Sequence, residues 1–252
     1  MIKRIKSYLK KKNIDPELLE KLRYIEWVVD VSIDNPIYYM KAIRHRSILV
    51  EEDFEPSDSY ERLEFLGDAV LDLIVTEIIF DYYPNKNEGF LTKLRSKLVK
   101  GDSLAMYANK LDLGSIVEVG ERAKGQGIEN SKSILADIFE ALIGALYLDK
   151  GYSSAFYFVK QIIDNYVNMD EMLKTLNNYK STLLEYSQAQ GWAVPEYEVV
   201  SETGPGHDKT FVIEVLVESE VMGEGKGKSK KQAEQEAARE ALIQLNAGDD
   251  YL

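Results

Sequence analysis

Glu61, Glu64 and Asp68 recur at helical spacing in the segment ERLEFLGDAVLDLIV, residues 61–75. If this segment is a helix, its apolar residues share one face, and Glu61, Glu64 and Asp68 line the adjacent stripe. Like charges three or four residues apart on a helix repel each other. Such a stripe therefore requires either solvent or a bound cation.

A second pair of acids follows in SILADIFEALIGALYLD, residues 133–149, where Asp137 and Glu140 lie beside an apolar helix face. Ala141 and Gly144 flank these acids and would let another backbone approach closely. Two helices of this kind can converge on a hard cation, and a ligand set made only of oxygen favours Mg²⁺ or Mn²⁺. Such an ion can activate water and stabilise a pentavalent phosphorus transition state.

The alternative is that these acids form an ordinary solvated face, which is the commoner role of charged residues on helices. Phe65 argues against it, because helical geometry puts this aromatic on the acidic side rather than the core side. A large exposed aromatic lowers solubility unless something covers it. A partner subunit would cover Phe65.

A different signal comes from the segment GEGKGKSKKQAEQEAAREAL, residues 223–242. Ser229 with Gln232 three residues on predicts a capping box and the start of a helix. Lysines in a first helical turn are unfavourable for the macrodipole but suit a phosphate beside free backbone N–H groups. Four lysines form a cluster around this helix start: Lys226, Lys228, Lys230 and Lys231. The alternative to a phosphate-binding site is that this segment is an ordinary solvated turn.

Composition narrows the possible chemistry of this chain of 252 residues, which contains no cysteine and two histidines, His45 and His207. Disulfides, a cysteine nucleophile and a Cys/His zinc site are excluded, and a reducing compartment is favoured. No apolar run approaches the roughly 20 residues of a membrane span. The basic start MIKRIKSYLKKK lacks the apolar core of a signal peptide. The formal net charge of −12 disfavours a polyanion partner on average, yet the lysine cluster is local.

The elements that must position these residues change in character near residue 172. Before it we expect only helices: one opened by Asp15-Pro16, one from Asn35 towards Ser47, and others over 59–82, 88–112, 131–148 and 153–171. After it we expect a helix at 179–190, strands at 197–202, 210–218 and 220–225, and a helix at 229–245.

The chain is thus expected to be multidomain. An all-α domain covers 20–172 after an N-terminal extension, 1–19. A linker at 173–178 leads to a small α+β domain of order α-β-β-β-α at 179–246.

Residues 61–71, ERLEFLGDAVL, are similar almost letter for letter to the signature of the ribonuclease III family. Further blocks that resemble this family are NPIYYMKAIRHRS (35–47), NEGFLTKLRSKLV (87–99) and ILADIFEALIGALYLDKG (134–151). The resemblance implies a homodimer with two active sites, each hydrolysing one strand of duplex RNA to leave 5′-phosphate and 3′-hydroxyl ends.

The same resemblance implies roles for individual residues. Mg²⁺, for which Mn²⁺ can substitute, is expected to bind Glu64, Asp68, Asp137 and Glu140, with Asp68 and Glu140 as the catalytic residues. Glu61 and Glu88 match supporting acids near the cleft, and Phe65 matches an aromatic at the dimer interface. His45 is expected to make a structural hydrogen bond.

Three elements after residue 178 resemble, in order, the double-stranded RNA-binding domain of this family: YKSTLLEYSQ (179–188), GPGHDKTF (204–211) and the lysine-bearing helix start. The resemblance implies recognition of A-form shape across the minor and major grooves. The residues expected to contact RNA are Glu185, Gln188, His207, Lys226, Lys228, Lys230 and Lys231. Leu184 departs from the glutamine usual at its position, which removes one polar groove contact.

The leading hypothesis is a cytoplasmic, Mg²⁺-dependent double-stranded RNA endonuclease that processes ribosomal precursors and other structured RNAs. We expect such an enzyme to need neither a membrane nor a small-molecule cofactor. A rival is a non-catalytic RNA-binding or ribosome-associated protein on the same scaffold, which the complete set of four acids disfavours. A helical protein–protein scaffold is a third option, and it leaves the basic helix start unexplained.

Overall fold

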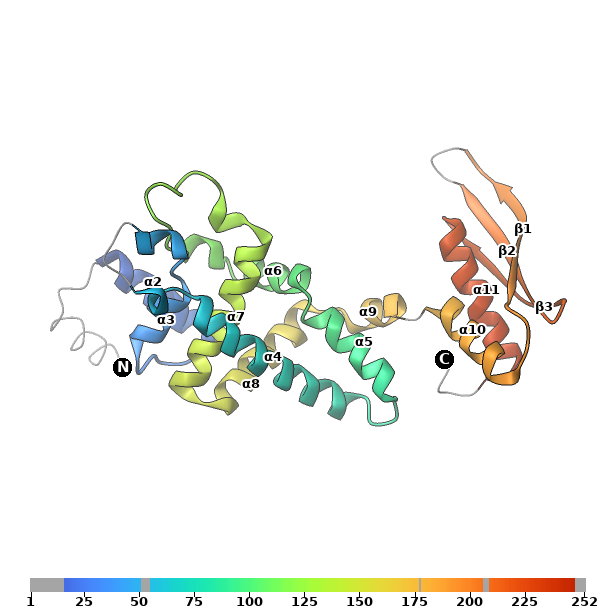
Figure 1. Cartoon of the computed structure of the whole chain (residues 1–252), viewed down its shortest axis with the longest axis horizontal. Coiled ribbons are helices and arrows are strands. Elements are labelled where there is room, and N and C mark those ends of the chain that lie inside the picture. Colours follow the sequence, from blue (N-terminus) through green and yellow to red (C-terminus); the bar gives the residue numbers. More distant parts are fainter. Residues whose placement is uncertain (1–15, 51–54, 177, 206–208, 248–252) are drawn as a thin grey trace. The chain divides into compact units, whose positions relative to one another are not determined.

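The computed structural model describes residues 16–50, 55–176, 178–205 and 209–247 (Figure 1). Contacts divide the chain into two units, Met1–Asn168 and Met169–Leu252. His207 and most of the N-terminal extension lie outside the described residues. Within the part of the chain that is described, no helix is both long and apolar enough for a bilayer crossing.

The first unit is built from helices, as the sequence predicts. They are α2 (Pro16–Val29), α3 (Pro36–Ala42), α4 (Glu61–Tyr82), α5 (Glu88–Leu98), α6 (Gly101–Lys110), α7 (Lys132–Lys150) and α8 (Tyr152–Tyr166). Short 3₁₀ turns lie at Arg46–Val50, Pro56–Asp58, Leu113–Ile116 and Ile128–Asn130. Asn35 caps α3 as expected, because its side chain accepts a hydrogen bond from the Ile37 N–H.

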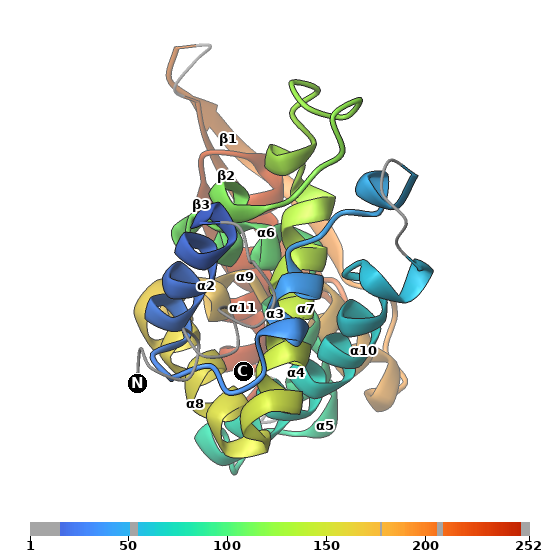
Figure 2. The same cartoon turned by 90° about the vertical axis from the view of Figure 1, so that its left-hand side faces the viewer.

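Helix α7 is the centre of this unit and packs against α3, α4, α6 and α8 (Figure 2). Its buried residues occur on almost every side of the helix, so it is surrounded rather than amphipathic. The buried side chains of α7 are Leu135, Ala136, Ile138, Phe139, Ala141, Leu142, Ile143, Ala145 and Leu146. The acids Asp137 and Glu140 are thereby held on a rigid element.

Three predicted helices of the first unit are shorter than expected. The helix predicted over 153–171 ends at Tyr166, because the backbone of Val167 is extended. The helix that begins after Asn35 stops at Ala42, because the backbone of Ile43 and His45 then pairs with Glu118 through two hydrogen bonds of 2.8 Å. Pairing with a distant segment outweighs the local helical pattern there.

The predicted helix over 88–112 is divided into α5 and α6 at Lys100, whose backbone is extended (φ −67°, ψ 149°). The Ser103 hydroxyl donates to the Lys97 carbonyl oxygen at 2.7 Å, and the Ser103 N–H donates to the Lys100 carbonyl oxygen at 2.8 Å. These bonds satisfy backbone groups that the turn would otherwise leave unpaired. Continuous helical periodicity concealed this break.

From residue 179 on, the second unit has the predicted order of one helix, three strands and one helix. These elements are α10 (Tyr179–Gln190), β1 (Glu196–Thr203), β2 (Thr210–Val217), β3 (Glu220–Gly227) and α11 (Lys230–Gln244). The strands form one antiparallel sheet in the order β1-β2-β3.

The segment predicted as an irregular linker, 173–178, is helical up to residue 176. It continues helix α9 (Met169–Leu176), which follows the end of α8 at Tyr166. The helical spacing of Met169, Met172 and Leu173 becomes visible only when the segment is read with the four residues before it.

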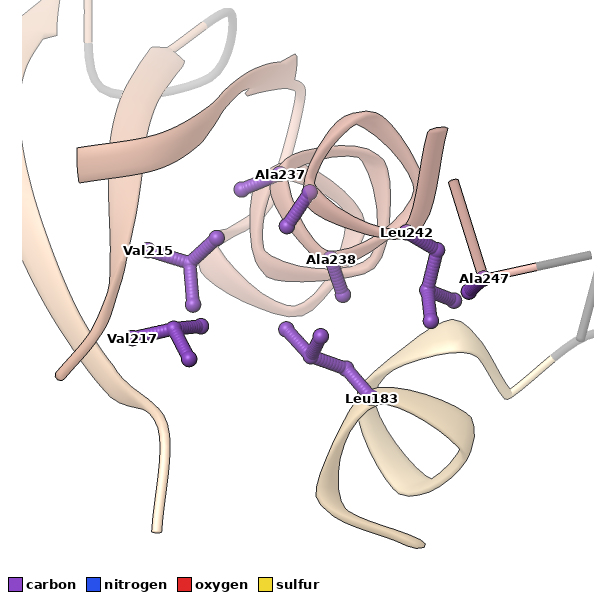
Figure 3. Packing of buried hydrophobic residues seen from close by; sticks show 8 residues of the cluster. Leu183, Val215, Val217, Ala237, Ala238, Leu242 and Ala247 are labelled. Atoms are coloured by element: carbon purple, nitrogen blue, oxygen red, sulfur yellow. The ribbon is translucent and has the colours of Figure 1, made fainter. Parts of the chain in front are cut away.

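Side chains from α10, β2 and α11 meet in the core of the second unit (Figure 3). Leu183 of α10 points towards Val215 and Val217 of β2 and towards the alanines of α11. Strand β3 comes unusually close to α11, since a Cβ added to Gly225 would lie 2.0 Å from the Ala233 carbonyl oxygen. The glycines before the lysine cluster therefore allow the helix to pack on the strand.

Candidate active site and nucleic-acid interface

Helices α4 and α7 cross with their backbones nearly in contact at two glycines. A Cβ added to Gly67 would lie 1.8 Å from the Glu140 carbonyl oxygen, and one added to Gly144 would lie 2.3 Å from the Leu63 carbonyl oxygen. The close approach expected at Gly144 is thus confirmed. This crossing brings the acids of α4 next to those of α7.

Three carboxylates from the two helices converge beside this crossing. Glu64 of α4 and Asp137 and Glu140 of α7 each offer an oxygen within 4.8 Å of the others, and all three are half-buried. Oxygen ligands around a six-coordinate Mg²⁺ lie about 3 to 4 Å apart, given bonds of about 2.1 Å. A small closure of the side chains would fit this group to such an ion, and the donor set contains only the hard oxygens that Mg²⁺ and Mn²⁺ prefer.

The electrostatics of the group also suit a cation. Burial raises the pKa of Glu140 to about 8, and the charges of Asp68, Glu64 and Asp137 add to this rise. The pKa values of Glu64 and Asp137 are also raised, chiefly by burial. Raised pKa values in a shared group of acids are typical of functional sites, and a divalent cation would relieve both their repulsion and their desolvation.

Asp68 lies at the edge of this group rather than within it. Its side chain is exposed, and it is absent from the three residues whose oxygens lie within 4.8 Å. Its charge is nevertheless the largest electrostatic contribution to the raised pKa of Glu140. The structure thus brings together three of the four predicted metal ligands and leaves the fourth beside them.

The two predicted supporting acids differ in their surroundings. Glu61 pairs with Arg46 at 3.6 Å, and its charge raises the pKa values of Glu64 and Asp137. Glu88 is exposed at the start of α5 and accepts a hydrogen bond of 2.8 Å from the Thr92 hydroxyl. The charges that raise the pKa of Glu140 come from acids on α4 and α7 rather than from Glu88.

His45 is buried and makes the kind of structural hydrogen bond that we expected. Its Nδ1 accepts from the Ser47 N–H at 3.2 Å and lies 2.9 Å from the Ser47 hydroxyl oxygen, which in turn accepts from the Gly120 N–H. Burial and the nearby Arg46 lower the pKa of His45, so the neutral ring is favoured.

Sequence reasoning missed Tyr60, the residue directly before the acidic motif. Its hydroxyl donates a hydrogen bond of 3.0 Å to Asp137 Oδ2, and its ring is buried. The only signal in the sequence was its position next to the motif, because its partner lies 77 residues further on.

The raised pKa values predict how stability depends on pH. An unfolded glutamate titrates near pH 4.3, so between roughly pH 5 and 8 the folded, metal-free protein retains protons that the unfolded chain has lost. Raising the pH through the folded pKa of about 8 therefore removes stability. We expect the melting temperature in EDTA to be at least about 3 °C lower at pH 8.5 than at pH 6, and Mg²⁺ to stabilise the protein more at the higher pH.

Differential scanning calorimetry at both pH values, with EDTA and with Mg²⁺, measures this. Glu140→Gln is the matched control. It keeps the contribution of the chain's other acids to the pH dependence of stability and removes the titration of Glu140 itself. An equal pH dependence in both proteins would contradict the prediction.

Phe65 is exposed over 81% of its surface on α4. It borders a hollow that is also lined by the side chains of Tyr38, Leu66 and Leu148. An aromatic ring beside an apolar hollow on one face is a self-complementary arrangement of the kind found at two-fold interfaces.

The predicted cap of the last helix is present in the second unit. The Ser229 hydroxyl accepts from the Gln232 N–H at 3.2 Å, while the Gln232 side chain accepts from the Lys228 N–H at 2.9 Å rather than from the cap residue itself. The side chains of Lys226, Lys228, Lys230 and Lys231 are all exposed around this helix start. Exposed lysines beside the N-terminus of a helix can bind the phosphates of a nucleic acid.

The leading helix α10 presents Glu185 and Gln188 to solvent three residues apart. Leu184 is half-buried and lines a hollow between α10 and α11 together with Ser181 and Lys231. An apolar residue therefore occupies a position close to one of the lysines expected to contact RNA.

Comparisons with known proteins agree with both units. Residues 35–166 match the family model described as ribonuclease-III-like, and residues 179–245 match the double-stranded RNA binding motif. A protein of Chlorobaculum tepidum named ribonuclease 3 is 43% identical over 218 residues, which is 85% of this chain and 80% of the relative. The ribonuclease 3 of Bacillus cytotoxicus is 40% identical over 236 residues, covering 94% and 96% of the two chains.

A solved structure gives the same result for the first unit. The crystal structure of the nuclease domain of ribonuclease III from Campylobacter jejuni aligns with a TM-score of 0.52 at 36% identity, covering 57% of this chain and 95% of that one. A second structure of that domain aligns with a TM-score of 0.53 at 34% identity, covering 57% and 98%.

This chain combines a helical nuclease domain, with a group of carboxylates suited to a metal ion, and a double-stranded RNA-binding domain. This combination defines the class of double-stranded RNA endonucleases. The chain belongs to the ribonuclease III family. Members of this family use a divalent metal ion, which agrees with the carboxylate group between α4 and α7.

Proposed function

We propose that the protein hydrolyses phosphodiester bonds in double-stranded RNA with Mg²⁺ and leaves 5′-phosphate and 3′-hydroxyl ends. The nuclease domain covers 20–172 and the RNA-binding domain covers 179–246. The observation that carries the proposal is the convergence of Glu64, Asp137 and Glu140 within 4.8 Å.

Each acid has a distinct part in this proposal. Glu64, Asp137 and Glu140 would hold the ion, with Asp68 completing the set when its side chain turns towards Glu140. Asp68 and Glu140 are the residues we assign to catalysis, with Glu61 and Glu88 in support. A bound Mg²⁺ would supply Lewis acidity at the phosphorus and lower the pKa of the attacking water.

The second unit would bring the duplex to this site. Lys226, Lys228, Lys230 and Lys231 are suited to phosphates, while Glu185 and Gln188 are suited to the minor groove, and we assign His207 to the same surface. Recognition of A-form shape suits ribosomal precursors and other structured RNAs as substrates. Such transcripts are made in the cytoplasm of bacteria, the kind of organism from which the relatives come, and we assign the activity to that compartment.

We further propose that the nuclease domain acts as a homodimer through Phe65. The exposed ring and the apolar hollow beside it support this pairing. One of the Campylobacter jejuni structures is described as showing flexibility in a region involved in dimer formation. A dimer would offer one site to each strand of the duplex.

A non-catalytic RNA-binding protein on the same scaffold is the second candidate function. A protein that only binds RNA would not need a complete acidic site. Here all four acids are present and three of them converge. The test is to incubate the full-length protein with duplex RNA, with Mg²⁺ and with EDTA, and to map the product ends. Cleavage that needs the metal and leaves 5′-phosphates supports the proposal, whereas intact RNA in both samples favours the rival.

Removing the second unit, residues 169–252, should weaken RNA binding more than chemistry. We expect the affinity for duplex RNA to fall at least about tenfold at physiological salt, because the lysine cluster is lost. Cleavage should persist at low salt. Filter binding and single-turnover cleavage across a salt series measure this, with the full-length protein as the control. Unchanged binding would remove the role assigned to the second unit.

A further inference from the structure

Tyr60 connects the two helices that carry the acids. Its hydroxyl donates to Asp137 Oδ2 at 3.0 Å across the gap between α4 and α7, while its ring is only 4% exposed. A hydrogen bond to an ionised carboxylate is among the stronger hydrogen bonds in proteins, and burial strengthens it further.

The backbone of Tyr60 also orders the start of α4. Its carbonyl oxygen accepts from the Leu63 N–H at 2.8 Å and from the Glu64 N–H at 2.9 Å, and its own N–H donates to the Arg44 carbonyl oxygen at 3.0 Å. One residue therefore contacts the main chain of the acid Glu64 and the side chain of the acid Asp137.

The ring of Tyr60 also lies beside the ring of His45, with 6.0 Å between the two ring centres. His45 is itself held by hydrogen bonds to Ser47, so this neighbour of the Tyr60 ring is anchored in turn. A carboxylate has two oxygens with about four acceptor sites in total, so a bond to Oδ2 leaves acceptor sites for an ion.

We propose that Tyr60 is a positioning residue that holds the Asp137 side chain turned towards Glu64 and Glu140. The inference deepens the proposed metal-dependent cleavage and rests on it. Partners that orient a metal-binding carboxylate through its second oxygen typically change metal affinity by 10- to 100-fold when removed.

The test is Tyr60→Phe in the full-length protein, which removes the hydroxyl and keeps the ring. Calorimetric titration with Mn²⁺, without RNA, should show about tenfold weaker binding. The metal concentration that gives half-maximal cleavage should rise by a similar factor, while the rate at saturating metal largely recovers. A purely structural role would lower the melting temperature without this separation of metal affinity from rate.

Tyr39→Phe is the matched control, because the Tyr39 hydroxyl donates to Asp149 Oδ2 at 3.2 Å in the same unit and its ring is fully buried. It loses the same kind of bond far along α7 from Glu140, and we expect Mn²⁺ affinity to stay unchanged. Equal Mn²⁺ affinity of Tyr60→Phe and the wild type would overturn the inference.

The metal titration also separates this inference from the proposed function. If the wild type cuts no RNA but Tyr60→Phe still weakens Mn²⁺ binding, the positioning role stands and the nuclease proposal fails. If the wild type cuts RNA and the variant binds Mn²⁺ normally, the nuclease proposal stands and the positioning role fails.

Discussion

Glu140→Gln should reduce RNA cleavage by about a thousandfold or more while leaving RNA binding nearly unchanged. The substitution keeps the size of the side chain and removes the charge at the centre of the acidic group. A metal ion in such a site stabilises the transition state by several kcal/mol, and each 1.36 kcal/mol corresponds to about a factor of ten in rate. Single-turnover cleavage of labelled duplex RNA measures the loss, and filter binding in EDTA measures the affinity.

Misfolding would not explain this result, because the variant removes a repulsive charge. Burial and four neighbouring acids raise the pKa of Glu140 to about 8, so its ionised form is unfavourable in the metal-free protein. We therefore expect Glu140→Gln to melt at the same temperature as the wild type or higher at pH 8.5 in EDTA.

The matched control is Asp81→Asn, which removes an exposed acid from the last turn of the same helix α4. It should cut at the wild-type rate. Cleavage by Glu140→Gln within tenfold of the wild type would show that the catalytic assignment is wrong, whatever happens to stability.

Local patterns were enough to predict most of the elements and to place acids beside the apolar faces of two helices. The acids of α4 and α7 repeat at helical spacing beside apolar faces, and Gly144 indicated that another backbone would approach. The order of α10, three strands and α11 followed from a change in periodicity. Both patterns depend on neighbours only a few residues apart.

What the sequence could not predict depends on contacts between distant segments. Helix α3 ends where the chain pairs with Glu118, and Tyr60 meets Asp137 only because α4 and α7 cross at two glycines. The edge position of Asp68 has the same origin, since helical spacing alone puts it on the stripe of Glu64. Spacing along one helix gives the direction of a side chain but not its distance from another helix.

Gly67→Ala should disrupt the crossing that brings the acids together. The new Cβ would lie 1.8 Å from the Glu140 carbonyl oxygen and 2.6 Å from the carbonyl carbon, so backbone atoms must move. Overpacking of this kind costs about 3 kcal/mol when side chains cannot relieve it. For a domain of this size we expect the melting temperature to fall by about 10 °C.

The same displacement should weaken the site itself, because α4 carries Glu64 and α7 carries Glu140. We expect Mg²⁺ to raise the melting temperature of Gly67→Ala much less than that of the wild type, and cleavage to be lost even at temperatures where the variant is folded. Circular dichroism with and without Mg²⁺ measures both effects.

Gly101→Ala is the control, since nothing lies within 4 Å of its added Cβ in the first turn of α6. Alanine favours a helix over glycine, so this variant should melt at the wild-type temperature or slightly above. Wild-type stability and full metal response in Gly67→Ala would mean that α4 and α7 do not need their close approach to form the site.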